Sequence, residues 1–181
     1  MLETIREYAF EMLQASGDAE DARRRHVAWY ADEAERLDLG SRTRDRGPCY
    51  ARLDDEYANL AAAIDFARET RDAELMLRLT TALSGFWATR GYVAEGRRAL
   101  EDAFAIADRR PPRAVRGFCT LRVLSGTTEG VLEEVHEAVR ACRELGDDLS
   151  LAYVTAGGSG KVWEIEWPRP GLRLNYSGLM G

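Results

Sequence analysis

The sequence predicts an all-α fold made of antiparallel helical hairpins, and three observations lead to that prediction. Hydrophobic residues make up 45% and charged residues 31% of the 181 positions, a balance typical of a globular domain. Apolar side chains recur every three or four positions through most of the chain, which is the spacing of a helix with one buried face. Similar side chains also return at a constant offset of 35 residues, beginning near Asp72.

Residues 1–40 predict an N-terminal helical hairpin. The first helix is expected over 2–16, with an apolar face that carries Leu2, Ile5, Tyr8, Ala9, Met12 and Leu13. Gly17 is placed to end it in the left-handed conformation that glycine adopts readily. The second helix is expected from about Asp18 to Asp38, with Ala22, Trp29, Ala34 and Leu37 on its apolar side, and it stops at Gly40.

A polar segment at residues 41–48, Ser-Arg-Thr-Arg-Asp-Arg-Gly-Pro, is the clearest linker in the chain. After it, a third helix is predicted over about 49–69. Its inward-facing residues are Leu53, Tyr57, Leu60, Ala61, Ile64 and Ala67.

An internal repeat follows from Asp72 onward. A shift of 35 residues superimposes Leu79 on Ala114 and Leu149, Ala82 on Gly117 and Ala152, and Leu83 on Phe118 and Tyr153. The second helix of each unit repeats in the same way, with Leu100 over Val135, Ala103 over Ala138, Phe104 over Val139 and Ala107 over Cys142. Gly91 and Gly126 share the offset, and each is placed to close the first helix of its unit.

This period, with two helices in each unit, is typical of the ~34-residue helix-turn-helix arrays of the tetratricopeptide type. Small residues at 82, 117 and 152 would let neighbouring helices approach closely, and the large apolar residues beside them would fill the space between units. We therefore expect a tetratricopeptide-like right-handed array over residues 41–157, with two complete hairpins and one unpaired helix in 72–157.

The C-terminal segment, residues 158–181, predicts an irregular tail. It is rich in glycine, and Pro168 and Pro170 prevent a second long helix. Trp163, Ile165 and Trp167 alternate with acidic residues, which suits a short extended segment with one apolar face. Because the last repeat lacks its second helix, we expect this tail to pack on the helix near 147–156, or the chain to self-associate through that end.

The net charge of −6 argues against binding to nucleic acid, which needs a basic face. Basic runs at 23–25, 42–46 and 109–113 are interpreted as solvated helix ends. Three cysteines without a CxxC spacing, namely Cys49, Cys119 and Cys142, fit neither a disulfide framework nor a zinc site. No stretch of 18 apolar residues is present, and so we expect a cytoplasmic protein with no membrane contact.

The residues that could carry chemistry do not form a catalytic pattern. Gly157–Lys161 resembles a phosphate-binding loop, but Thr155 stands where the motif needs glycine and Val162 where it needs Ser or Thr. The only histidines, His26 and His136, lie far apart in the sequence, and His26 is assigned a structural role. Carboxylate groups at Asp54-Asp55-Glu56 and Glu133-Glu134 are expected to face water. We predict no catalytic residue, cofactor or metal site.

Several aromatic residues allow two interpretations. Trp29, Tyr30, Phe86, Trp87 and Tyr92 could line a groove for a peptide or a small ligand. At helical spacing such residues more often form the core and the contacts between helices, and that interpretation is favoured.

Two stretches near the N-terminus resemble a known family. The first is Leu2-Glu3-Thr4-Ile5-Arg6-Glu7-Tyr8-Ala9 with Arg24-Arg25-His26 and Trp29-Tyr30, and the second is Leu53-Asp54-Asp55-Glu56-Tyr57-Ala58-Asn59-Leu60 with Ala63. The resemblance continues through Leu77-Arg78-Leu79, Phe86-Trp87, Arg90-Gly91, Glu95-Gly96-Arg97-Arg98, Leu100-Glu101 and Arg143-Glu144-Leu145-Gly146-Asp147. These residues are similar to a segment of bacterial signal-transducing P-loop ATPases of the STAND type, which include LuxR-like and SARP-like transcriptional regulators. The resemblance covers about residues 2–157.

The resemblance implies that the chain contains the end of a winged-helix region and the start of a helical-repeat sensor domain. Because Met1 stands where the family would be mid-protein, we expect the nucleotide-binding and DNA-binding parts to be missing. Glu56 with Asn59, and Arg97 with Arg98, match family positions and are assigned to helix pairing and capping before recognition.

The function that follows from the resemblance is a non-catalytic sensor or scaffold module of a transcriptional regulator. Such a module would bind a protein partner or a regulatory ligand, or self-associate, through its repeat surface. The alternative is a truncated regulator remnant with no independent activity, and an enzyme is a distant third.

Overall fold

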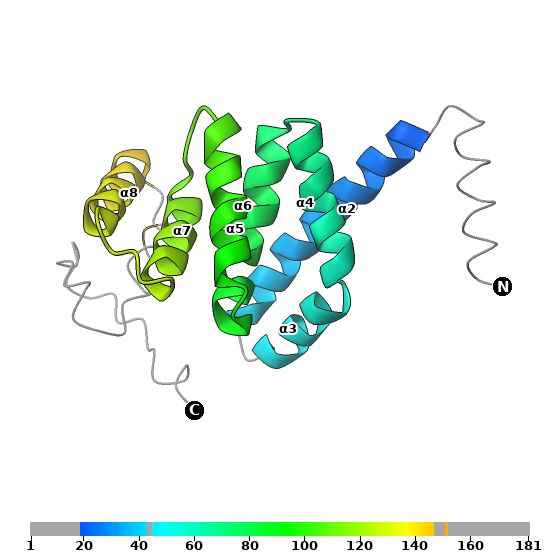
Figure 1. Ribbon diagram of the computed structural model, residues 1–181, viewed down its shortest axis with the longest axis horizontal. Coiled ribbons are helices and arrows are strands. Elements are labelled where there is room, and N and C mark those ends of the chain that lie inside the picture. Colours follow the sequence, from blue (N-terminus) through cyan, green and yellow to red (C-terminus); the bar gives the residue numbers. More distant parts are fainter. Residues whose placement is uncertain (1–18, 43–44, 147–150, 152–181) are drawn as a thin grey trace.

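A computed structural model describes residues 19–42, 45–146 and 151 of the chain. Within these residues the structure contains seven helices and no strand, which confirms the all-α prediction (Figure 1). The helices are α2 (Ala19–Ser41), α3 (Arg46–Asp55), α4 (Tyr57–Glu69), α5 (Ala73–Arg90), α6 (Val93–Ile106), α7 (Pro112–Leu124) and α8 (Val131–Leu145).

The predicted helix over 49–69 is wrong, because the structure divides it into α3 and α4 at Glu56. Three acidic residues in succession at the end of α3 are unfavourable there, since a helix C-terminus carries partial negative charge. The side chain of Glu56 is held at the break by hydrogen bonds from Tyr30 and Asn59. Helix α3 also begins earlier than predicted, at Arg46, which places Pro48 in the first turn where its missing N–H is tolerated. The linker is therefore shorter than 41–48.

Helix α2 passes Gly40 and ends at Ser41, one residue beyond the predicted stop. The Ser41 hydroxyl donates to the Asp38 carbonyl at 2.8 Å in this last turn. A Cβ atom at position 40 would lie 2.7 Å from the sulfur of Cys49 on α3. Gly40 therefore permits a close approach of α3 and does not act as the predicted helix terminator.

The two glycines expected to close the first helix of each repeat unit do so. Gly91 follows α5 with a φ of 85°, and Gly126 follows the end of α7 with a φ of 83°. Both angles lie in the left-handed region that glycine adopts without strain. Helix α5 pairs with α6 and α7 pairs with α8 across these turns, and α5 also packs on α7.

The close approach predicted at position 117 is present. A Cβ atom at Gly117 would lie 2.6 Å from the Cβ and Oγ atoms of Ser84 on α5. Leu79, Leu83 and Leu100 are fully buried in the same core. The first core cluster extends over α2 to α7, and a second lies between α7 and α8, where it includes Leu151. Helix α2 thus shares one core with α3–α7.

Two of the basic runs contain residues that are not solvated helix ends. The carboxylate of Asp38 on α2 accepts hydrogen bonds from Arg42 and, at 2.6 Å, from Arg113 on α7. The Asp38 side chain is only 8% exposed, and burial raises its pKa above the usual value although both guanidinium groups lower it. The interpretation of Arg42 and Arg113 was wrong because tertiary packing brings a buried carboxylate to them.

Several predictions fall outside the described residues: the helix over 2–16, the closure by Gly17, the tail over 158–181 and its packing. The boundaries of the predicted parts 1–40, 41–157 and 158–181 therefore stay predictions.

Candidate functional site

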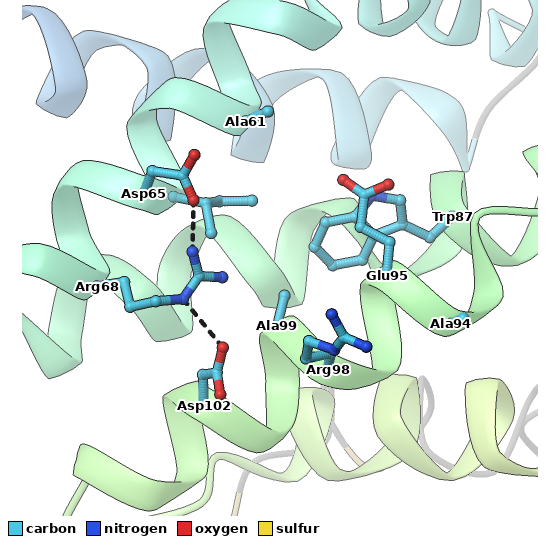
Figure 2. Close-up of a pocket in the computed structure, with 10 residues that line it drawn as sticks. Ala61, Asp65, Arg68, Trp87, Ala94, Glu95, Arg98, Ala99 and Asp102 are labelled. Carbon is cyan, nitrogen blue, oxygen red and sulfur yellow. Dashed lines mark hydrogen bonds and ion pairs between the residues drawn. The ribbon is translucent and has the colours of Figure 1, made fainter.

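A hollow of about 470 Å³ lies between α4 and α6 (Figure 2). Its walls combine small or apolar residues with five charged residues, and one residue of α5 forms its base. The lining residues are Ala61, Ile64, Asp65, Arg68, Trp87, Ala94, Glu95, Arg98, Ala99 and Asp102. A volume of this size is within the usual range of ligand-binding clefts.

Small side chains leave the space open. Ala61 on α4 and Ala94 and Ala99 on α6 do not reach across the gap between the two helices. The base is the buried indole of Trp87, which donates from Nε1 to the Tyr57 hydroxyl at 2.9 Å. A Cβ atom at Gly96 would lie 2.6 Å from this indole, and so glycine is needed where α6 crosses Trp87.

An ion-pair cluster joins the two walls at the C-terminal ends of α4 and α6. Arg68 donates to Asp65 on its own helix and, from Nε at 3.0 Å, to Asp102 on α6 (Figure 2). All three side chains are at least 40% exposed. This cluster therefore adds little to the stability of the fold, since an exposed ion pair contributes only about 0–1 kcal/mol.

Towards the N-terminal ends of the same helices, Glu95 interacts with Tyr57. Burial raises the pKa of the Tyr57 hydroxyl well above its usual value, and its hydrogen bond to Glu95 raises that pKa further. The phenol consequently stays protonated and remains a donor to Glu95. The Tyr57 hydroxyl therefore lacks the properties of a general acid or base near neutral pH.

Two adjacent arginines on α6 differ in their surroundings. Arg97 forms an ion pair with Glu101 one turn further along the same helix. Arg98 lines the hollow and, among the described residues, forms no ion pair or hydrogen bond. The assignment of helix pairing therefore fails for Arg98. It holds for Glu56, which joins α2 to the α3–α4 junction through the 2.9 Å hydrogen bond from Tyr30.

The aromatic residues mainly form core contacts, as favoured by the sequence. Phe86 and Trp87 are buried, and Tyr30 is 7% exposed. Tyr57 stacks on the ring of Tyr92 with centroids 4.9 Å apart. Trp29 and Tyr92 remain exposed, and only Trp87 of the predicted aromatic set lines the hollow.

The other candidate residues do not converge. His26 and His136 are both exposed, on α2 and α8. Glu133 faces water as expected, but Glu134 was assigned wrongly, since it accepts from Arg122 on α7 at 2.9 Å. Asp54 also pairs with Arg90 across to α5.

Three further observations concern metals, thiols and membranes. No group of three or more potential metal ligands occurs within 19–42, 45–146 and 151. Cys49, Cys119 and Cys142 are buried, and burial together with Glu134 raises the pKa of Cys119 to about 12, so its thiol is unreactive. None of the described helices is both long and apolar enough to cross a bilayer. The loop at 157–161 lies outside the described residues.

The hollow itself was not predicted from the sequence. Ala61 was expected to face inward, and Arg97-Arg98 were noted only as family positions. Alanines on two helices do not show from the sequence whether the space between the helices is filled or open. In this fold that space depends on how α6, at Gly96, packs on Trp87 of α5.

The described part of the chain is a helical protein with a hollow between α4 and α6. Comparison with known proteins identifies similar sequences. Three curated proteins named "Putative HTH-type transcriptional regulator", two from Mycobacterium tuberculosis strains and one from Mycobacterium bovis, are each 29% identical over 183 aligned positions. The alignment covers 94% of this chain but 20% of each relative, so the chain spans about a fifth of their length. No family model and no solved structure matches. The chain is thus a distant relative of proteins named as transcriptional regulators.

Proposed function

We propose that this chain is a non-catalytic, tetratricopeptide-like module of a cytoplasmic STAND-type transcriptional regulator, and that it binds a segment of a protein partner in the α4–α6 hollow. The observation that carries the proposal is the hollow itself. Its base is a rigid buried indole, its walls are alanines and an isoleucine, and its rim is charged. A concave surface with small apolar walls and a few fixed polar groups is typical of binding sites.

The electrostatics of the hollow favour binding over catalysis. Its acidic residues are already engaged, with Asp65 and Asp102 on Arg68 and Glu95 on Tyr57. None of the described residues that line it is a histidine or a cysteine. A general base or a nucleophile would need a free group with a matched pKa. The distant relatives named as transcriptional regulators support a regulatory role.

The test uses the full chain and peptides selected from a random 12-residue display library. Ala94→Trp places an indole in the hollow from an exposed position, and Ala105→Trp makes the same change on the same helix outside the lining. We expect peptide affinity, measured by isothermal titration, to fall at least tenfold in the first variant and to stay unchanged in the second. Circular dichroism should show both variants to be folded.

Two outcomes contradict the proposal. Equal affinities of the two variants would place peptide binding elsewhere. A library from which no peptide binds above background would favour the alternative that this chain is a regulator remnant with no independent activity.

A further inference from the structure

Arg98 is the charged residue of the hollow whose natural partners are already taken. An arginine on a helix usually pairs with a carboxylate three or four positions away. For Arg98 these positions hold Glu95, Glu101 and Asp102. Glu101 forms an ion pair with Arg97 on the same helix. Glu95 is engaged by Tyr57 and Asp102 by Arg68, both of which belong to α4 on the opposite wall. The contacts that join the two walls thus engage two of the three carboxylates, and the Arg97–Glu101 ion pair engages the third.

The neighbouring arginine shows what Arg98 would do with a free carboxylate. Arg97 has Glu101 four positions further on, and the two form an ion pair. In Figure 2 the guanidinium group of Arg98 lies below Glu95, on the other side of Ala99 from Asp102. It carries five N–H donors in a planar fork that matches a carboxylate. No described residue accepts from them.

The next inference rests on the proposed function. We propose that the partner is an acidic peptide segment, and that Arg98 selects it by binding a carboxylate that the segment places in the hollow. The carboxylate would pair with the Arg98 guanidinium, while short apolar side chains of the segment contact Ala61, Ala94 and Ala99. The alanine walls exclude water from one side of the pair and strengthen it relative to an exposed pair. The acidic groups already present are held by Tyr57 and Arg68 and therefore compete weakly for Arg98.

The closing experiment compares Arg98→Gln with Arg97→Gln, two variants that lose the same charge at adjacent positions. Peptides from the selection above are synthesised with an acetylated N-terminus and an amidated C-terminus, so that any carboxylate is a side chain. Each is paired with a version in which Asp and Glu are replaced by Asn and Gln. A third version has a free C-terminus. It tests whether Arg98 recognises the terminal carboxylate of a peptide and not a side-chain carboxylate.

We expect the unaltered chain to bind the acidic peptide at least tenfold more tightly than its amide version. Arg98→Gln should abolish this preference, whereas Arg97→Gln should keep it within twofold. Raising the salt concentration should weaken the binding of the acidic peptide more than the binding of its amide version. If the free C-terminus alone restores the preference, a terminal carboxylate is the group that Arg98 recognises.

The inference is overturned if both arginine variants lose affinity equally, or if the selected peptides are basic and bind through Glu95. If Ala94→Trp still blocks binding in that case, the hollow remains the binding site and only the role of Arg98 fails. If no peptide binds, the proposed function and this inference fail together.

Discussion

Helices α2 and α7 are connected by an ion pair between an aspartate and an arginine, and so are α4 and α6. In neither case are the two helices consecutive in the chain. Asp38 and Arg113 join α2 to α7, and their side chains are 8% and 28% exposed. Asp102 and Arg68 join α6 to α4, and theirs are 40% and 41% exposed. The chemistry of the two bridges is the same, but the first is enclosed by the core and the second borders an open hollow.

The difference follows from the size of the side chains around each bridge. Helices α2, α5 and α7 bring leucines and aromatic rings together in one continuous core. Between α4 and α6 the facing residues include three alanines, and space remains above Trp87. Burial therefore decides whether a bridge contributes strongly to the stability of the fold or only borders an open hollow. The predictions below test this contrast, from the largest expected effect to the smallest.

Truncation in the close-packed region should have the largest effect. Leu83→Ala or Leu100→Ala should each lower the free energy of unfolding by about 2–5 kcal/mol, because both side chains are fully buried and each change leaves a cavity. Chemical denaturation followed by circular dichroism measures this loss. A loss below ~1 kcal/mol for both variants would show that this region is not closely packed.

Asp38→Ala should lower the free energy of unfolding by about 2–4 kcal/mol. Removing one partner of a fully buried ion pair costs ~3–5 kcal/mol, and the partly exposed guanidinium groups of Arg42 and Arg113 reduce that figure. The same denaturation measurement applies. A change in the free energy of unfolding of less than ~0.5 kcal/mol would show that Asp38 contributes no more than an exposed carboxylate. The contrast with Asp102 would then be lost.

Gly117→Ala should lower the free energy of unfolding by about 1–3 kcal/mol, since the new methyl group would overlap Ser84 on α5. Ser84→Gly removes the opposing atoms, and so the double variant should recover part of the loss. A double-mutant cycle measures this recovery. Strictly additive losses would mean that the two positions do not touch.

Arg68→Ala should change stability by no more than about 1 kcal/mol, because its partners Asp65 and Asp102 are exposed. The matched comparison is Asp38→Ala at the enclosed bridge. A loss from Arg68→Ala that equals the loss from Asp38→Ala would refute the argument that burial separates the two bridges.

His26→Ala should leave the melting temperature nearly unchanged. The imidazole is exposed and forms a T-shaped contact with the Tyr30 ring, with centroids 4.8 Å apart. Surface substitutions of this kind usually alter stability by less than about 0.5 kcal/mol. A decrease as large as that of Leu83→Ala would identify His26 as part of the core.

Helical periodicity and the repeat offset in the sequence predicted most of the helical architecture. The positions of Leu79, Leu83 and Leu100, and the two left-handed glycines 91 and 126, follow from helical periodicity and the repeat offset. The break at Glu56 was missed because Leu53, Tyr57 and Leu60 keep the same periodicity across it. A helix that bends while its apolar face stays in register gives no signal in periodicity alone.

The sequence by itself determined the fold class and the core positions, because backbone hydrogen bonding and apolar burial depend on spacing along the chain. Only the tertiary structure decided which charges meet. Asp38 and Arg113 are 75 positions apart, and Arg68 and Asp102 are 34 positions apart. The same holds for Arg98, which looks identical to Arg97 in the sequence. Its distinct surroundings arise because Arg68 and Tyr57 of another helix engage Asp102 and Glu95, while Arg97 pairs with Glu101.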